Sequence, residues 1–102
     1  MNRVQSVLNR AKDTIADCAC WCKSAQARDA AGFQEDFDSP IAVAWDMNGA
    51  IKKVELDHEI RRCAADALIK TLGQTASYWQ NLSARTHSEV IDAFDRAIVG
   101  AA

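Results

Sequence analysis

The four cysteines are the residues whose spacing first suggests chemistry, because three of them form the sequence Cys-Ala-Cys-Trp-Cys at positions 18–22. Thiolates bind zinc when they converge on one point, usually from Cys-x2-Cys pairs, and no such pair occurs here. In the helix that we expect over this segment, Cys18 and Cys22 share a face while Cys20 points elsewhere. Neither histidine stands at ligand spacing from another donor. The sequence therefore predicts no metal site, and it predicts free thiols that pack as small apolar groups in a reducing compartment.

The lysines and arginines are the second group with a definite chemistry. Clustered cations neutralise the phosphates of duplex DNA, and that contact supplies affinity without sequence preference. The predicted phosphate contacts are Lys52, Lys53, Arg61, Arg62, Arg3 and Arg10. The alternative is a set of solvated surface charges interleaved with acidic residues. Because the net charge is −2, any DNA contact has to be a local patch.

No residue pattern points to catalysis. The chain has no glycine-rich phosphate loop, and His58 and His87 have no candidate nucleophile near them in the sequence. Asp36 and Asp38 form a pair of acids, but they lie in a predicted turn and are expected to be solvated. We therefore expect a protein that is not an enzyme and needs no cofactor.

A β-hairpin over residues 41–56 is the element expected to position Lys52 and Lys53. Asn48-Gly49 separates two runs of about seven residues, and Asn-Gly favours a tight turn with positive φ at both positions. Pairing outward from that turn places five apolar residues on one face, namely Ile41, Val43, Trp45, Val54 and Leu56. With a short strand at residues 33–37, a three-stranded antiparallel sheet is expected over residues 33–57.

Helical periodicity flanks the predicted sheet. Apolar residues in segment 1–31 recur at alternating intervals of four and three, which is a heptad seam, and Gly32 ends that helix. Residues 58–100 have a helical pattern too, either continuous or broken at Gly73, and a capping box begins at Thr86. One small sheet cannot cover both helical faces, so we expect an intertwined homodimer; a monomer whose helices cover each other is the alternative. The predicted dimer contacts are Val4, Leu8, Ile15, Cys18 and Cys22.

The predicted hairpin carries a resemblance to a known family. Residues 43–49 (VAWDMNG) and 51–57 (IKKVELD) resemble an alternating strand, a Met-Asn-Gly turn and a basic-apolar strand that ends in an acid. This pattern is similar to that of the YbaB/EbfC family of bacterial nucleoid-associated proteins. The resemblance implies an α-β-β-β-α protomer that dimerises and binds double-stranded DNA by contacting the phosphate backbone of the DNA.

The sequence thus predicts one α+β domain over residues 1–102, with an N-terminal helix, a three-stranded antiparallel sheet and a long C-terminal helix. As its function we expect sequence-independent DNA binding by a nucleoid-associated homodimer in the cytosol. The alternative is a non-enzymatic adaptor for a protein partner, a role that the resemblance associates with type VII secretion loci. DNA binding requires the basic residues to converge, whereas an adaptor is expected to have mixed charge and exposed apolar surface. No apolar run approaches the ~20 residues that cross a membrane, so no membrane contact is expected.

Overall fold

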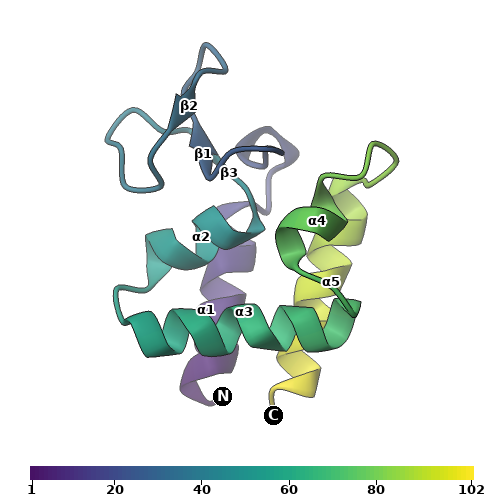
Figure 1. The fold of residues 1–102 in the computed structure, drawn as a ribbon. Coiled ribbons are helices and arrows are strands. Elements are labelled where there is room, and N and C mark those ends of the chain that lie inside the picture. Colours follow the sequence, from purple (N-terminus) through teal and green to yellow (C-terminus); the bar gives the residue numbers. More distant parts are fainter.

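The computed structural model describes residues 1–102 and consists of helices below a small lobe of strands (Figure 1). The α-helices are α1 (Arg3–Thr14), α2 (Met47–Val54), α3 (His58–Leu72), α4 (Ala76–Gln80) and α5 (His87–Gly100). A 3₁₀ helix spans Cys18–Cys20, and the strands are β1 (Ala27–Arg28), β2 (Gln34–Glu35) and β3 (Ala44–Trp45). Helix α3 crosses α1 and α5, and the strand lobe, residues 21–45, lies at the end opposite the two termini (Figure 1). None of the helices combines the length and apolar character that crossing a membrane requires.

Short-range signals set the ends of several helices. Asn2 caps α1, because its side chain accepts a hydrogen bond from the Gln5 amide at 2.8 Å while the Gln5 side chain accepts one from the Asn2 amide at 3.0 Å. Gly73 ends α3 in the left-handed conformation, with φ of 76°. Thr86 and Glu89 form the capping box that begins α5. Of the two alternatives for residues 58–100, the structure has the break at Gly73, and the predicted restart at Thr86 is confirmed.

The sheet has the predicted type, and β2 and β3 lie within the predicted segment 33–57, whereas β1 lies before it. Its strands are antiparallel in the order β2-β1-β3, and Ala27 lies opposite both Glu35 and Trp45. Trp21 adds an isolated parallel bridge to Trp45. The α+β class and the three-stranded antiparallel sheet are confirmed. The strands, however, are only two residues long, and β1 falls inside the segment predicted to be helical.

The predicted hairpin at residues 41–56 is wrong, because Asn48 and Gly49 lie in the first turn of α2. Asp46 caps this helix and accepts a hydrogen bond from the Gly49 amide at 2.6 Å. Gly49 does not have positive φ, so it is not a turn glycine. Of the expected apolar face only Trp45 is buried, whereas Leu56 is 86% exposed. The capping carboxylate, rather than the Asn-Gly pair, decides the local structure.

The predicted helix over residues 1–31 is also wrong beyond Thr14. The Asp17 side chain accepts a hydrogen bond from the Ala19 amide at 2.9 Å and caps the 3₁₀ helix instead of continuing α1. Short polar side chains compete with the helix in this way, which explains the early end. The chain then turns, with Ser24 at φ of 64°, and enters β1.

The predicted heptad seam packs inside the single chain. Leu8 and Ile15 are fully buried in a core that also contains Leu68, Val90 and Phe94 from α3 and α5. Val4 is partly buried against the same core. The break at Gly73 allows α3 and α5 to pack on α1, and this burial accounts for Leu8 and Ile15 without a second copy, whereas Cys18 is exposed. Dimerisation stays a prediction.

Candidate functional site

Three of the six predicted DNA contacts meet at the C-terminal end of α2. Arg10 Nη1 donates to the carbonyl of Val54 at 2.8 Å, and Arg61 donates to the carbonyls of Lys52, at 2.8 Å, and Glu55. Arg3 and Arg10 also pair with the Glu55 carboxylate at 3.3 and 3.8 Å. The last carbonyls of a helix lack partners within the helix, and these arginines supply them. Arg3, Arg10 and Arg61 therefore have a structural role that the sequence did not suggest.

Glu55 is the acid at the centre of this arginine cluster. Its carboxylate accepts a hydrogen bond from the Asp57 amide at 3.2 Å. This bond, followed by the charge of Arg3, holds the pKa of Glu55 below its ordinary value. The contact joins α1 to the α2–α3 connection, two segments that are far apart in the sequence.

The other three predicted contacts lie along α2 and α3. Lys52 Nζ is 5.9 Å from the ring centre of Phe37, and Lys53 Nζ is 4.7 Å from the ring centre of Trp45. Neither lysine forms an ion pair, whereas Arg62 pairs with Glu59 at 3.4 Å. A hollow of about 450 Å³ is lined by Lys52, Arg61 and Arg62. The structure thus brings Lys52, Arg61 and Arg62 together around one hollow, whereas Lys53 does not line it.

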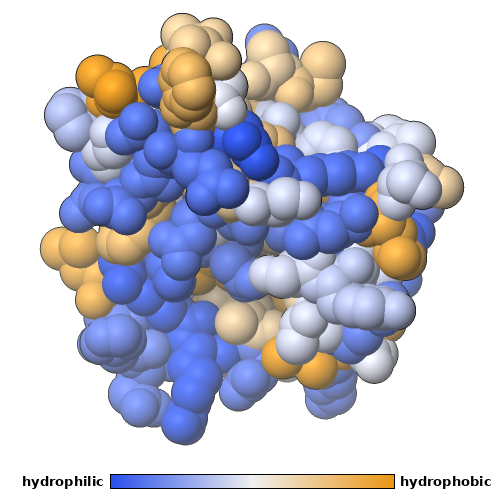
Figure 2. All heavy atoms as spheres, turned by 45° about the horizontal axis from the view of Figure 1, so that its top comes forward, coloured by the Kyte–Doolittle hydropathy of each residue, from blue (hydrophilic) through white to orange (hydrophobic).

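The outer part of the strand lobe carries exposed apolar side chains. Phe33 is 70% exposed, Ile41 is 58% exposed and Val43 is 46% exposed. Extending the register of the sheet places Asp29 opposite both Phe33 and Val43, in agreement with the hydrogen bond from the Asp29 amide to the Phe33 carbonyl at 3.0 Å. Figure 2 shows hydrophobic side chains at the upper edge of the molecule, on the side of the strand lobe, and hydrophilic ones over most of this face.

Acidic side chains lie on the same lobe as these apolar residues. Asp36 and Asp38 are exposed, and the side chains of Asp29 and Glu35 accept hydrogen bonds from nearby groups. None of the four carboxylates forms an ion pair. Arg28, the cation within β1, donates to the carbonyls of Gly32 and Lys23 instead. We call this surface the acidic tip; it consists of Phe33, Ile41, Val43, Asp29, Glu35, Asp36 and Asp38.

Sequence reasoning missed the acidic tip for a specific reason. It assigned Ile41 and Val43 to a core face on the strength of the hairpin register. In the structure Asp46 caps α2 and no hairpin forms. The segment before Ala44 therefore has no helix packed behind it, and the side chains of Ile41 and Val43 are exposed. The run of acids at 35–38 was the one signal in the sequence for the charge of this surface.

A buried polar network lies beneath the strand lobe, at the start of α2. The Gln80 side-chain oxygen accepts hydrogen bonds from the amide of Met47 at 3.0 Å and from Trp21 Nε1 at 3.4 Å. Its nitrogen is buried without an acceptor. Burial raises the pKa of the neighbouring Asp46 carboxyl, although the Gly49 amide opposes that rise.

The cysteines do not form a metal site. Cys18 and Cys63 are exposed, and Cys20 and Cys22 are partly buried, so the expected burial of Cys18 and Cys63 is wrong. Burial, reinforced by the charge of Asp46, raises the pKa of the Cys22 thiol to about 11. No three histidine, cysteine, aspartate or glutamate side chains stand close enough to hold a metal ion.

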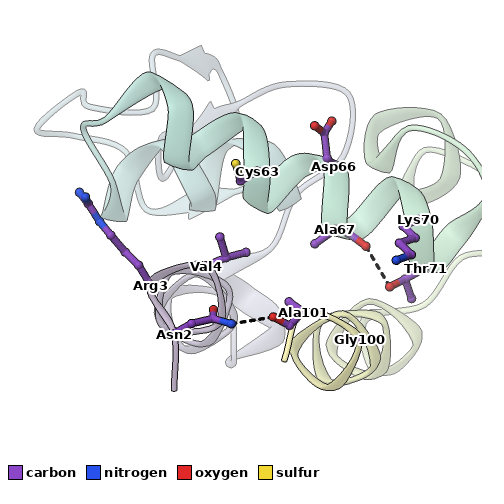
Figure 3. A pocket seen from close by; sticks show the side chains of 10 residues that line it. All are labelled: Asn2, Arg3, Val4, Cys63, Asp66, Ala67, Lys70, Thr71, Gly100 and Ala101. Atoms are coloured by element: carbon purple, nitrogen blue, oxygen red, sulfur yellow. Dashed lines mark hydrogen bonds between the residues drawn. The ribbon is translucent and has the colours of Figure 1, made fainter.

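The largest hollow in the surface, about 580 Å³, lies between the start of α1, the middle of α3 and the end of α5 (Figure 3). Val4 and Ala67 face each other across it, and Asn2 donates to the carbonyl of Ala101 at 2.7 Å along its edge. Arg3 and Asp66 extend away from it (Figure 3). The hollow offers apolar contact without a converging set of polar groups that would orient a ligand.

Comparison with known proteins identifies a family. A family model described as a family of unknown function, DUF6197, matches residues 1–99. Neither the curated proteins nor the solved structures gave a significant match. The resemblance to the YbaB/EbfC family is wrong, because the matching family is a different one and the residues that carried the resemblance form α2 and its flanks rather than a hairpin. The chain belongs to the DUF6197 family, whose function is unknown.

Proposed function

We propose that this protein is a non-enzymatic binding module whose acidic tip docks an apolar, basic segment of another protein. The observation that carries the proposal is the exposure of Phe33, Ile41 and Val43 on one short lobe. Apolar surface gains roughly 25 cal/mol per Å² when a partner removes it from water, and grouped exposed apolar residues are typical of interaction surfaces.

The negative charge of the acidic tip determines which kind of partner it favours. The acidic tip carries four carboxylates without an ion pair, and two copies meeting through it would place like charges opposite each other. A segment with lysine or arginine beside its apolar residues meets complementary charge instead. The surface therefore favours a basic partner over a second copy of this chain.

Two synthetic peptides of equal length test the proposal, one built from leucine and lysine and the other from leucine and glutamate. We expect the basic peptide to bind, by fluorescence anisotropy, and the acidic peptide not to bind. The double variant Phe33→Ser, Ile41→Ser should weaken binding by about tenfold or more, since apolar anchors carry most of an interface's free energy. Leu56→Ser is the control, because Leu56 is as exposed but lies outside the tip. Equal binding of both peptides, or loss of binding in the control alone, would contradict the proposal.

Sequence-independent binding of DNA is the second candidate, and one observation favours it. Lys52 and Lys53 have no acidic partner, and Lys52 shares a hollow with Arg61 and Arg62. The test is the Kd for random-sequence duplex DNA between ~50 and ~200 mM salt, where each phosphate contact adds about 0.9 to the log–log slope. The double variant Lys52→Ala, Lys53→Ala should lower that slope by about two. A slope near zero in the parent protein would remove this candidate, together with the nucleoid location proposed with it.

A further inference from the structure

A polar hollow of about 290 Å³ lies between α2, α3 and α4, apart from the acidic tip. Asp46 and Asn48 line it from the start of α2, Ser77 from α4 and Gln26 from the segment before β1. Asn48 Nδ2 donates to Ser77 Oγ at 2.9 Å, which holds α2 against α4. Lys52 and Arg61 line it as well. The wall of the hollow therefore contains one carboxylate and two cations.

The charge on Asp46 is not explained by its role as a helix cap. Asparagine or serine in its place would accept the same hydrogen bond from the Gly49 amide without placing a charge in the interior. Loss of surrounding water raises the pKa of the Asp46 carboxyl, whereas the Gly49 amide, the Gln80 side chain and the charge of Lys52 oppose that rise. The carboxyl is therefore largely shielded from bulk water and lies within the electrostatic reach of Lys52.

Lys52 provides the opposite charge. It lines the same hollow as Asp46, and its charge lowers the pKa of Asp46, yet the two side chains do not form an ion pair. Arg61 stands beside it, with Nε and Nη2 donating to carbonyls and Nη1 making no hydrogen bond within the protein. Opposite charges that line one hollow without contact can be joined by a molecule that carries both.

We propose that this hollow binds a small zwitterion of the amino-acid class, with its ammonium group on Asp46 and its carboxylate on Lys52 and Arg61. Asn48 and Ser77 also line the hollow and offer an amide and a hydroxyl for polar groups of the ligand. The volume limits the ligand to a small molecule. The site is independent of the partner proposed for the acidic tip.

Titration of the ¹⁵N-labelled protein with glycine, serine, glutamate and 4-aminobutyrate, each added alone, tests the proposal by NMR. At least one of these should shift the amide signals of Asn48, Gly49 and Ser77 saturably below about 10 mM. Acetate and methylammonium serve as probes of the two ends separately. Each should bind more weakly than the best zwitterion, because each makes only half of the contacts.

Two conservative variants locate the site. Asp46→Asn keeps the cap oxygen for the Gly49 amide, and Lys52→Met keeps the length of the side chain; each should weaken binding by about tenfold or more, as expected when one partner of a charge pair is removed. Asp57→Asn is the control, because Asp57 caps α3 in the same manner outside the hollow. No saturable shift with any of the four amino acids, acetate binding as tightly as the best of them, or unchanged binding in Asp46→Asn would overturn the proposal.

Discussion

Among the glycines, Gly49 is the position at which adding a single methyl group should lower the stability of the fold most. A Cβ built on Gly49 would lie 1.9 Å from the carbonyl oxygen of Gln26 and 2.8 Å from its carbon. That carbonyl accepts the hydrogen bond from the Asp46 amide at 3.2 Å and belongs to the segment that enters β1. The oxygen is backbone, so it cannot swing aside as the end of a flexible side chain would. Gly49→Ala must therefore push α2 and β1 apart.

The cost follows from three terms. Forcing an extra methyl group into a packed interior costs about 1–3 kcal/mol. Losing the hydrogen bond between Asp46 and Gln26 adds about 1 kcal/mol. Alanine is better than glycine inside a helix, which offsets about 1 kcal/mol. The net loss of stability is about 2 kcal/mol, and for a domain of this size that lowers Tm by roughly 10 °C or more.

Thermal unfolding followed by far-ultraviolet circular dichroism measures this loss. Gly100→Ala is the matched control, because Gly100 ends α5 and a Cβ there meets no atom within 4 Å. The control should melt at the wild-type temperature or slightly above it. If Gly49→Ala also melts within a degree or two of wild type, the close approach of α2 to the Gln26 carbonyl is refuted.

Three further changes have definite expected outcomes. Gly73→Ala should cost about 1 kcal/mol through its left-handed backbone alone, since nothing lies within 4 Å of the added carbon, and urea unfolding measures it. Glu55 has a lowered folded pKa, so the stability it contributes is present above its ordinary value of 4.5 and is lost as the pH falls through the folded value. Glu55→Gln should flatten the acid limb of a stability–pH curve, whereas an unchanged limb would contradict the lowered pKa of Glu55. Cys22, whose pKa is raised from 9.0 to about 11, should react roughly tenfold more slowly at pH 8 with a disulfide reagent than exposed Cys63, in variants retaining one cysteine each, because its smaller thiolate fraction is partly offset by the greater nucleophilicity of a more basic thiolate.

The parts of the fold that the sequence predicted correctly are those set by contacts within one turn of chain. Gly73 ends α3 because of its own backbone freedom, and Thr86 begins α5 through Glu89, three residues later. The strand that pairs as β2 lies within the predicted segment 33–37. Each of these signals involves residues close enough in sequence to be recognised without knowing what packs around them.

The hairpin failed because two local signals compete over the same residues. Asn48-Gly49 favours a turn, whereas Asp46 followed three residues later by the amide of Gly49 favours a helix cap. Alternation of apolar residues supported the turn, but two contacts from outside the segment support the cap. Gln80, 33 residues along the chain, supplies an acceptor for the Met47 amide, and Gln26 approaches Gly49 so closely that only glycine fits. Both of these supporting contacts are tertiary, and no pattern within residues 41–56 reveals them.

The basic residues illustrate the same limit for function. Arg3, Arg10 and Arg61 are far apart in the sequence, and their common target is the set of carbonyls and the carboxylate at the end of α2. A count of charges treats every arginine as available to a ligand, whereas the fold shows which guanidinium groups already have partners. Lys52 and Lys53, in contrast, lie on α2 without an acidic partner, so their charges are available to a ligand. The charges that the fold leaves without an ion pair, and that our two proposals use, are the carboxylates of the acidic tip and the Asp46 and Lys52 side chains that line the polar hollow.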